Sequence, residues 1–119
     1  MKKKQSYENL PVWTESLDLV KDLYLLTSIF PEEEDNLLVR KLQKQAIEIP
    51  TNISKGMLNE EDRIQYLKAA NLNIVEIQTV LFISQKLGFI EAKDVEKINN
   101  KIDRIDTDLQ GLVQKLSRR

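Results

Sequence analysis

The residues that could do chemistry in this chain are carboxylates, lysines and arginines, because the sequence contains no cysteine and no histidine. Disulfides, thiolate chemistry, imidazole metal ligands and any triad with a histidine base are therefore excluded. The densest carboxylate block is Glu32-Glu33-Glu34-Asp35, directly after Pro31. Consecutive residues of a helix point in different directions, so four such carboxylates do not converge on one cation. We interpret the block as the start of a helix, where negative charge complements the helix dipole.

Glu76 is the single carboxylate with an unusual setting, because it falls between Leu72 and Val80 in an apolar row at helical spacing. A carboxylate there is costly unless it is paired or hydrogen-bonded. Its candidate partners are Lys44, Asn52 and Lys55, and the alternative is a solvated position at the rim. A hydrolase with Glu76 and Asn52 in a cleft is conceivable, but the chain has no glycine-rich phosphate loop and its serines lack an evident base. We expect no enzymatic activity, no catalytic residue, no metal and no cofactor.

The elements that position these residues follow from the apolar spacing. At 119 residues, 41% hydrophobic and with three Gly and three Pro, the chain is long enough for one core and favours long helices over strands. The periodicity predicts four helices, at residues 12–30, 35–58, 60–87 and 92–117. The last carries a seam with heptad spacing: Val95, Ile98, Ile102, Ile105, Leu109, Leu112 and Leu116. We predict an all-α, antiparallel up-down four-helix bundle over residues 11–119, after a basic tail at residues 1–10.

The second predicted helix contains Pro50, yet its apolar row continues on both sides of that proline. An interior proline costs roughly 3 kcal/mol and bends a helix. We therefore expect a proline-kinked helix, and the alternative is that one helix stops at Ile49 and another begins at Pro50. Asn52 and Gly56 share one side of this helix. Two interpretations stay open there: an ordinary surface amide near a fraying end, or a polar contact with another helix.

The third predicted helix is apolar on two sides. Asn59, with Asp62 three residues later, is its predicted N-cap, and Leu87-Gly88-Phe89 has the pattern of a glycine-terminated helix end. Its core face is Leu67, Ala70, Ile74, Ile77 and Leu81, and Val75 and Phe82 lie on one flank. A second stripe lies nearly opposite the core face: Leu72, Val80, Ile83 and Leu87. A four-helix bundle covers one face of each helix, so the second stripe predicts burial against another subunit.

Charge is nearly balanced, with a formal net charge of −1. That balance argues against strong general binding of nucleic acid by one copy. Basic residues cluster at the two ends of the sequence, and several copies together could bind phosphates. The possible nucleic-acid contacts are Lys2, Lys3, Lys4, Arg118 and Arg119. No apolar run is long enough to span a membrane and no signal-peptide core follows the first lysines, so we expect a cytoplasmic protein without a membrane partner.

Three segments resemble the four-helix-bundle proteins encoded by intervening sequences of 23S rRNA genes. They are Tyr7-Glu8-Asn9-Leu10-x-Val12-Trp13, Ile49-Pro50-Thr51-Asn52-Ile53-Ser54-x-Gly56 and Leu87-Gly88-Phe89; Tyr66-Leu67 and residues 70–81 also match. That family is similar to accessory proteins of diversity-generating retroelements, which form basic pentameric barrels that engage nucleic acid and a reverse transcriptase. The resemblance implies a homopentamer, with Asn52, Gly56 and Glu76 as structural or interface residues. We expect Pro50, at the kink, to be structural as well.

The chain departs from the family pattern at several positions. Lys55 replaces a glutamate, Leu72-Asn73 replaces Gly-Ser, Lys44 replaces an arginine and Glu48 replaces a serine. The overall acidity also differs from the basic retroelement proteins. We expect a non-enzymatic homo-oligomeric bundle, acting as a scaffold or as an accessory factor associated with RNA, the ribosome or a nucleic-acid enzyme. The alternative is an adaptor that docks a partner helix on the third helix.

Overall fold

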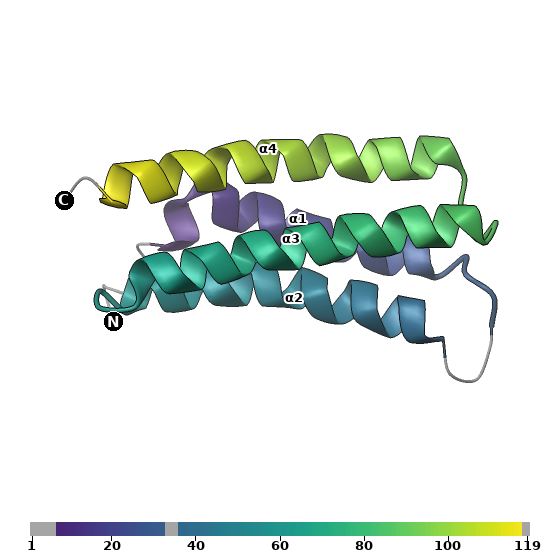
Figure 1. The fold of residues 1–119 in the computed structure, drawn as a ribbon, viewed down its shortest axis with the longest axis horizontal. Coiled ribbons are helices and arrows are strands. Elements are labelled where there is room, and N and C mark those ends of the chain that lie inside the picture. Colours follow the sequence, from purple (N-terminus) through teal and green to yellow (C-terminus); the bar gives the residue numbers. More distant parts are fainter. Residues whose placement is uncertain (1–6, 33–35, 118–119) are drawn as a thin grey trace.

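The computed structural model describes residues 7–32 and 36–117. A short 3₁₀ helix, η2 (Tyr7–Asn9), precedes four long helices: α1 (Pro11–Thr27), α2 (Leu37–Leu58), α3 (Arg63–Lys86) and α4 (Ala92–Ser117). Successive helices run in opposite directions along the long axis, with their connections at alternate ends (Figure 1). No strand occurs in these two described ranges. The prediction of an all-α four-helix bundle is confirmed.

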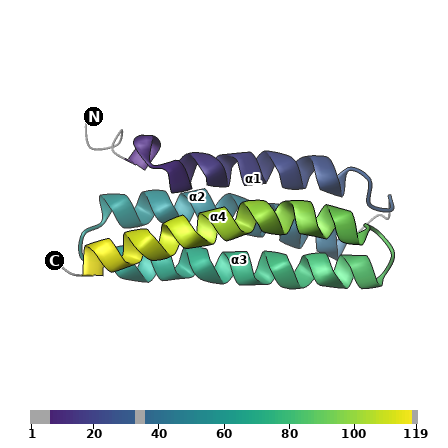
Figure 2. The same ribbon diagram turned by 90° about the horizontal axis from the view of Figure 1, so that it is seen from above.

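The helices form a ring in which each one packs on two neighbours. α1 and α3 each contact α2 and α4, and α2 packs most extensively on α3. Seen from above, α1 and α3 lie at opposite edges with α2 and α4 between them (Figure 2). The centre is filled by aliphatic side chains from all four helices that are almost completely buried: Leu19, Leu23, Leu42, Ile49, Ile53, Leu67, Ile77, Leu81, Ile102, Ile105 and Leu109. Burial of this kind of surface drives folding.

α2 runs without a break through Pro50, so the alternative of two separate helices is wrong. Asn36 caps its first turn, because the Asn36 side chain accepts hydrogen bonds from the backbone N–H groups of Leu38 and Val39. The interpretation of the acidic block as the start of this helix is wrong, because α2 begins at Leu37 and has no acidic residue in its first turn. Residues 33–35 of the block lie outside the described residues. The expected kink at Pro50 stays a prediction.

Two helix ends differ from the predicted ones by three residues, and the others by two residues or fewer. α1 ends at Thr27 rather than at residue 30, because the N–H groups of Ser28, Ile29 and Phe30 bond to carbonyls three residues back and tighten the chain into a turn. α3 begins at Arg63 rather than at residue 60. The N-cap of α3 is Asp62, so the prediction of Asn59 as the N-cap is wrong. Asn59 Oδ1 does accept a hydrogen bond from the Asp62 N–H at 3.1 Å, but residues 60–62 form a turn.

The end of α3 is a Schellman motif, as the sequence pattern suggests. Gly88 has a φ of +80°, its N–H bonds to the Gln85 carbonyl, and the Phe89 N–H bonds to the Ser84 carbonyl at 2.9 Å. Phe89 then packs edge-on against Phe30, with ring centroids 5.7 Å apart. This contact joins the α3–α4 connection to the turn that follows α1.

The predicted tail is partly structured, because η2 occupies residues 7–9. Tyr7 packs edge-on against Trp13 with ring centroids 5.1 Å apart, and Leu10 packs against the core. The described part of the tail is therefore an N-terminal cover for α1.

Candidate interaction surface

The outer side of α3 carries large apolar side chains that the bundle does not cover. They are Leu72, Val75, Phe82, Ile83 and Leu87, with exposed fractions of 67%, 49%, 53%, 42% and 57%. We call these five residues the α3 outer face. Single exposed leucines are ordinary, but a group of this size on one helix is a feature of interaction sites. Its members follow from the sequence, because the helical period separates them from the buried Ile74, Ile77 and Leu81.

Val80 does not belong to that face, so its predicted place in the second stripe is wrong. Its side chain is 4% exposed and packs in the core of its own bundle. The reason is helical spacing: Val80 is three residues after Ile77 and four before Ser84, and both of these are completely buried. Residues at this spacing share one side of a helix, which here faces into the bundle.

Glu76 lies at a solvated rim and not in a buried pocket. Its side chain is 38% exposed, and its Oε1 lies 3.6 Å from Nζ of Lys41 on α2. The candidate partners Lys44, Asn52 and Lys55 are therefore wrong for Glu76, and the rim alternative holds. Lys44 is exposed, because it is rotated by about 100° from the neighbouring Gln45, which faces α3. A half-exposed ion pair of this kind adds at most about 1 kcal/mol.

Asn52 makes the polar contact between helices that the sequence left open. Its side chain is 8% exposed, and its Nδ2 donates to Oδ1 of Asn73 on α3 at 2.9 Å. Asn73 Nδ2 in turn donates to Oε1 of Gln45 at 2.7 Å. These three amides form a chain of hydrogen bonds across the α2–α3 contact, which satisfies polar groups that burial would otherwise penalise. Sequence reasoning missed Asn73 and Gln45, because their pairing depends on the antiparallel register of α2 and α3.

Gly56 lies at a close approach of α2 to α3, and among the three described glycines it alone leaves no room for a side chain. A Cβ built on Gly56 would lie 3.1 Å from the Arg63 carbonyl oxygen and 3.3 Å from both Tyr66 Cβ and Leu67 Cδ2. Arg63 also caps the end of α2, since its Nε donates to the Gly56 carbonyl at 3.0 Å and its Nη2 to the Met57 carbonyl at 3.1 Å. Sequence reasoning missed this role of Arg63, which lies five residues after the end of α2 and is the first residue of α3.

A second apolar surface is a groove between α1 and α2 of about 320 Å³. Its lining is Trp13, Leu17, Val20, Ile47, Pro50, Thr51 and Ser54, and we call it the α1–α2 groove. At its inner edge Trp13 Nε1 donates to Ser54 Oγ at 2.9 Å, and Ser54 Oγ donates to the Pro50 carbonyl at 2.9 Å. The indole is thereby held in one orientation by the turn of α2 that contains the proline. Leu17, which also lines the groove, is exposed.

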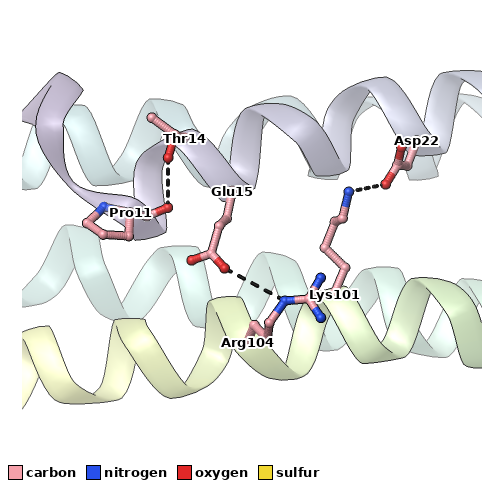
Figure 3. Close-up of polar contacts among 6 residues, drawn as sticks. All are labelled: Pro11, Thr14, Glu15, Asp22, Lys101 and Arg104. Carbon is pink, nitrogen blue, oxygen red and sulfur yellow. Dashed lines mark hydrogen bonds and ion pairs between the residues drawn. The ribbon is translucent and has the colours of Figure 1, made fainter.

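The contact between α1 and α4 is lined with charged side chains. Lys101 Nζ pairs with Asp22, and Arg104 Nε lies 3.9 Å from Glu15 Oε2 (Figure 3). Glu15 is also close to Asp108, and a hydrogen bond with Asp108, burial and the charge of Asp108 raise the pKa of Glu15 to about 7. Sequence reasoning missed this cluster, because its members lie at opposite ends of the chain. The described residues contain no group of three or more acidic side chains arranged to hold a metal ion.

The possible nucleic-acid contacts Lys2, Lys3, Lys4, Arg118 and Arg119 all lie outside the described residues. Their role stays a prediction. The described helices include none with both the length and the apolar character needed to cross a membrane.

The sequence also matches a known protein family. Residues 8–111 match the model of the 23S rRNA-intervening sequence protein family. The chain belongs to this family. The resemblance to this family is therefore confirmed, while the similarity to retroelement accessory proteins stays a prediction. The match begins within η2 and ends at residue 111, within α4.

A solved structure supports the fold. The chain is similar to a protein of unknown function from the S23 ribosomal protein family of Bacteroides thetaiotaomicron, with 21% sequence identity and a TM-score of 0.75. The similarity covers 86% of this chain and 97% of the other. At this level of sequence identity the similarity shows a shared fold alone. No curated protein matches the sequence significantly.

Proposed function

We propose that this member of the 23S rRNA-intervening sequence protein family is a non-enzymatic scaffold that assembles from copies of itself. The observation that carries the proposal is the α3 outer face, where five large apolar side chains remain uncovered in one copy. Water contact with such a surface is unfavourable by about 25 cal/mol for each Å² of apolar area. Covering it with another chain removes that cost.

The α1–α2 groove is the complementary surface that we assign to a second copy. Leu17 and Ile47 are exposed at its edges, and its walls are mostly apolar. The α3 outer face and the groove belong to different helices, so one bundle can use both at once. A contact between two different surfaces is heterologous, and it gives a closed ring when the rotation between copies closes. A homopentamer is one such ring and is the assembly that we propose.

The ring would also bring the basic ends of several chains together. Each copy contributes Lys2, Lys3, Lys4, Arg118 and Arg119. Several copies of such a cluster can bind a phosphate backbone that one nearly neutral copy binds weakly. An RNA, or an enzyme that acts on nucleic acid, is therefore the proposed partner of the assembly, and its location is cytoplasmic.

Light scattering coupled to size-exclusion chromatography tests the assembly. We expect the wild-type protein to elute as an oligomer at micromolar concentration and the Leu72→Asp variant to elute as a monomer, because a carboxylate would be buried at the interface. The matched control is Leu25→Asp on α1, where the leucine is similarly exposed (62%) but lies outside both proposed surfaces. We expect this control to remain oligomeric.

A monomeric wild-type protein at micromolar concentration would overturn the proposal. So would a Leu72→Asp variant that assembles like the wild type. RNA binding is tested separately by a salt titration, in which the affinity should fall steeply as salt rises. The absence of affinity at low salt would remove RNA as the partner and leave the scaffold itself intact.

A further inference from the structure

The contact between α1 and α4 contains a carboxylate that the fold leaves poorly compensated. Glu15 Oε1 is buried and receives no hydrogen bond from any donor among the described residues. The other oxygen, Oε2, faces Arg104 Nε across 3.9 Å, which is too long for a hydrogen bond (Figure 3). The Arg104 side chain is itself mostly exposed, so water screens its charge. An ionised Glu15 would therefore be only partly stabilised in this position.

The groups around Glu15 add negative charge. Asp108 of α4 lies against it, Asp18 of α1 acts on it from the same helix, and Asp103 lines the same shallow pocket on α4. Arg104 is the opposing cation. Two neighbouring carboxylates repel when both are ionised, and they attract when one proton lies between them. The same geometry raises the pKa of Glu15 to about 7, because of the hydrogen bond with Asp108, then burial, then the charge of Asp108.

We propose that a proton held between Glu15 and Asp108 latches α1 to α4, and that the contact between these helices loosens when the proton leaves. Deprotonation leaves two facing carboxylates, one of them with a buried oxygen that has no donor among the described residues. The latch lies near the end of the bundle where Leu10, Pro11 and Val12 pack beside Gly111 and Leu112. Its opening is therefore local to η2, the start of α1 and the last part of α4.

The sign of the pH effect follows from proton linkage. The folded protein holds the Glu15 proton up to about pH 7, whereas the unfolded chain releases it near the ordinary value of 4.5. The stabilisation is complete below pH 4.5, falls as the pH rises through this window and is lost above about 7. The unfolding constant should rise by up to about tenfold for each pH unit in the window. Partial exposure of Glu15 will reduce that figure.

The test is urea unfolding of the wild type and the Glu15→Gln variant at pH 5, 6, 7 and 8, at one protein concentration. The glutamine side chain has nearly the same shape as that of glutamate but cannot ionise. We expect the unfolding constant of the wild type to rise roughly tenfold from pH 5 to pH 8. For Glu15→Gln, the change in the logarithm of the unfolding constant over the same pH range should be less than half of the wild-type change. Asp108→Asn should reduce the slope in the same way, which keeps the test decisive if one variant folds poorly.

The matched control is Asp22→Asn, which removes the ion pair with Lys101 in the same helix contact. It should lower stability while keeping the wild-type pH slope. Hydrogen exchange, corrected for the intrinsic pH dependence, should show faster opening of residues 7–20 and 100–115 at pH 8 and little change in α2 and α3. Equal slopes in wild type and Glu15→Gln would overturn the latch. So would an NMR titration in which the Glu15 carboxyl keeps the ordinary midpoint of 4.5.

Discussion

The two described helix-interior glycines should respond to alanine with opposite signs. Both Gly56 and Gly111 lie within helices, and replacing glycine by alanine there gains up to about 1 kcal/mol from backbone entropy and propensity. At Gly111 nothing lies within 4 Å of the new Cβ. We therefore expect Gly111→Ala to stabilise the protein by about 0.5–1 kcal/mol, because the gain meets no opposing term.

At Gly56 the same gain is opposed by overpacking. The new Cβ would lie 3.1 Å from the Arg63 carbonyl oxygen and 3.3 Å from Tyr66 Cβ. These atoms belong to the backbone of α3 or are attached directly to it, so they can yield only if the first turn of α3 moves. Overpacking typically costs about 1–3 kcal/mol, and movement would also strain the hydrogen bonds from Arg63 to the end of α2. The net expectation for Gly56→Ala is a loss of about 1 kcal/mol, the overpacking cost less the propensity gain.

Circular dichroism at 222 nm during urea and thermal unfolding provides the measurement. For a domain of this size, 1 kcal/mol corresponds to a shift in Tm of about 4 °C. Gly56→Ala should therefore melt several degrees below wild type and Gly111→Ala a few degrees above it, at the same protein concentration. If Gly56→Ala proved as stabilising as Gly111→Ala, the close approach of α2 and α3 would not restrict residue size, and the reasoning would be refuted.

Two further substitutions test the α2–α3 amide chain and the end of α3. Asn52→Ala should lower the free energy of unfolding by about 1–3 kcal/mol, because it removes the donor to Asn73 Oδ1 in a partly buried contact; an unchanged urea midpoint would contradict this. Gly88→Ala should cost about 1 kcal/mol, since an alanine at a φ of +80° is strained although nothing lies within 4 Å of its Cβ. If strain is the cause, the loss should be smaller in a Gly88→Asn variant, because asparagine tolerates this conformation better than alanine does. Equal losses for both variants would contradict strain as the cause.

Much of the fold was readable from local patterns. Apolar residues at a spacing of three and four specify where the helices run. Pro11 marks the start of α1, and Gly88 marks the end of α3. Those signals act within one or two helical turns, so a linear reading can find them. The α3 outer face was predictable for the same reason, since the helical period alone separates Leu72, Ile83 and Leu87 from the buried row.

The burial and the partners of a side chain were less predictable where its residue lies at the edge of a helix face. Val80 was assigned to the outer stripe, but its side of α3 faces into the bundle and is buried there. For Glu76 the sequence left open a buried partner on α2 or a solvated rim, and the structure places it at the rim beside Lys41. Such choices depend on the rotation of α3 relative to its neighbours, which the periodicity of a single helix does not specify.

The amino-acid sequence by itself determined the helices, the bundle, the family and the absence of thiol and imidazole chemistry, because these follow from residue types and short-range spacing. Tertiary structure alone decided the pairings between distant helices. Asn52 meets Asn73, and Glu15 meets Asp108 and Arg104, because antiparallel packing sets the register between helices. Register is a property of two packed surfaces, so the proton latch and the amide chain exist only once the bundle has formed.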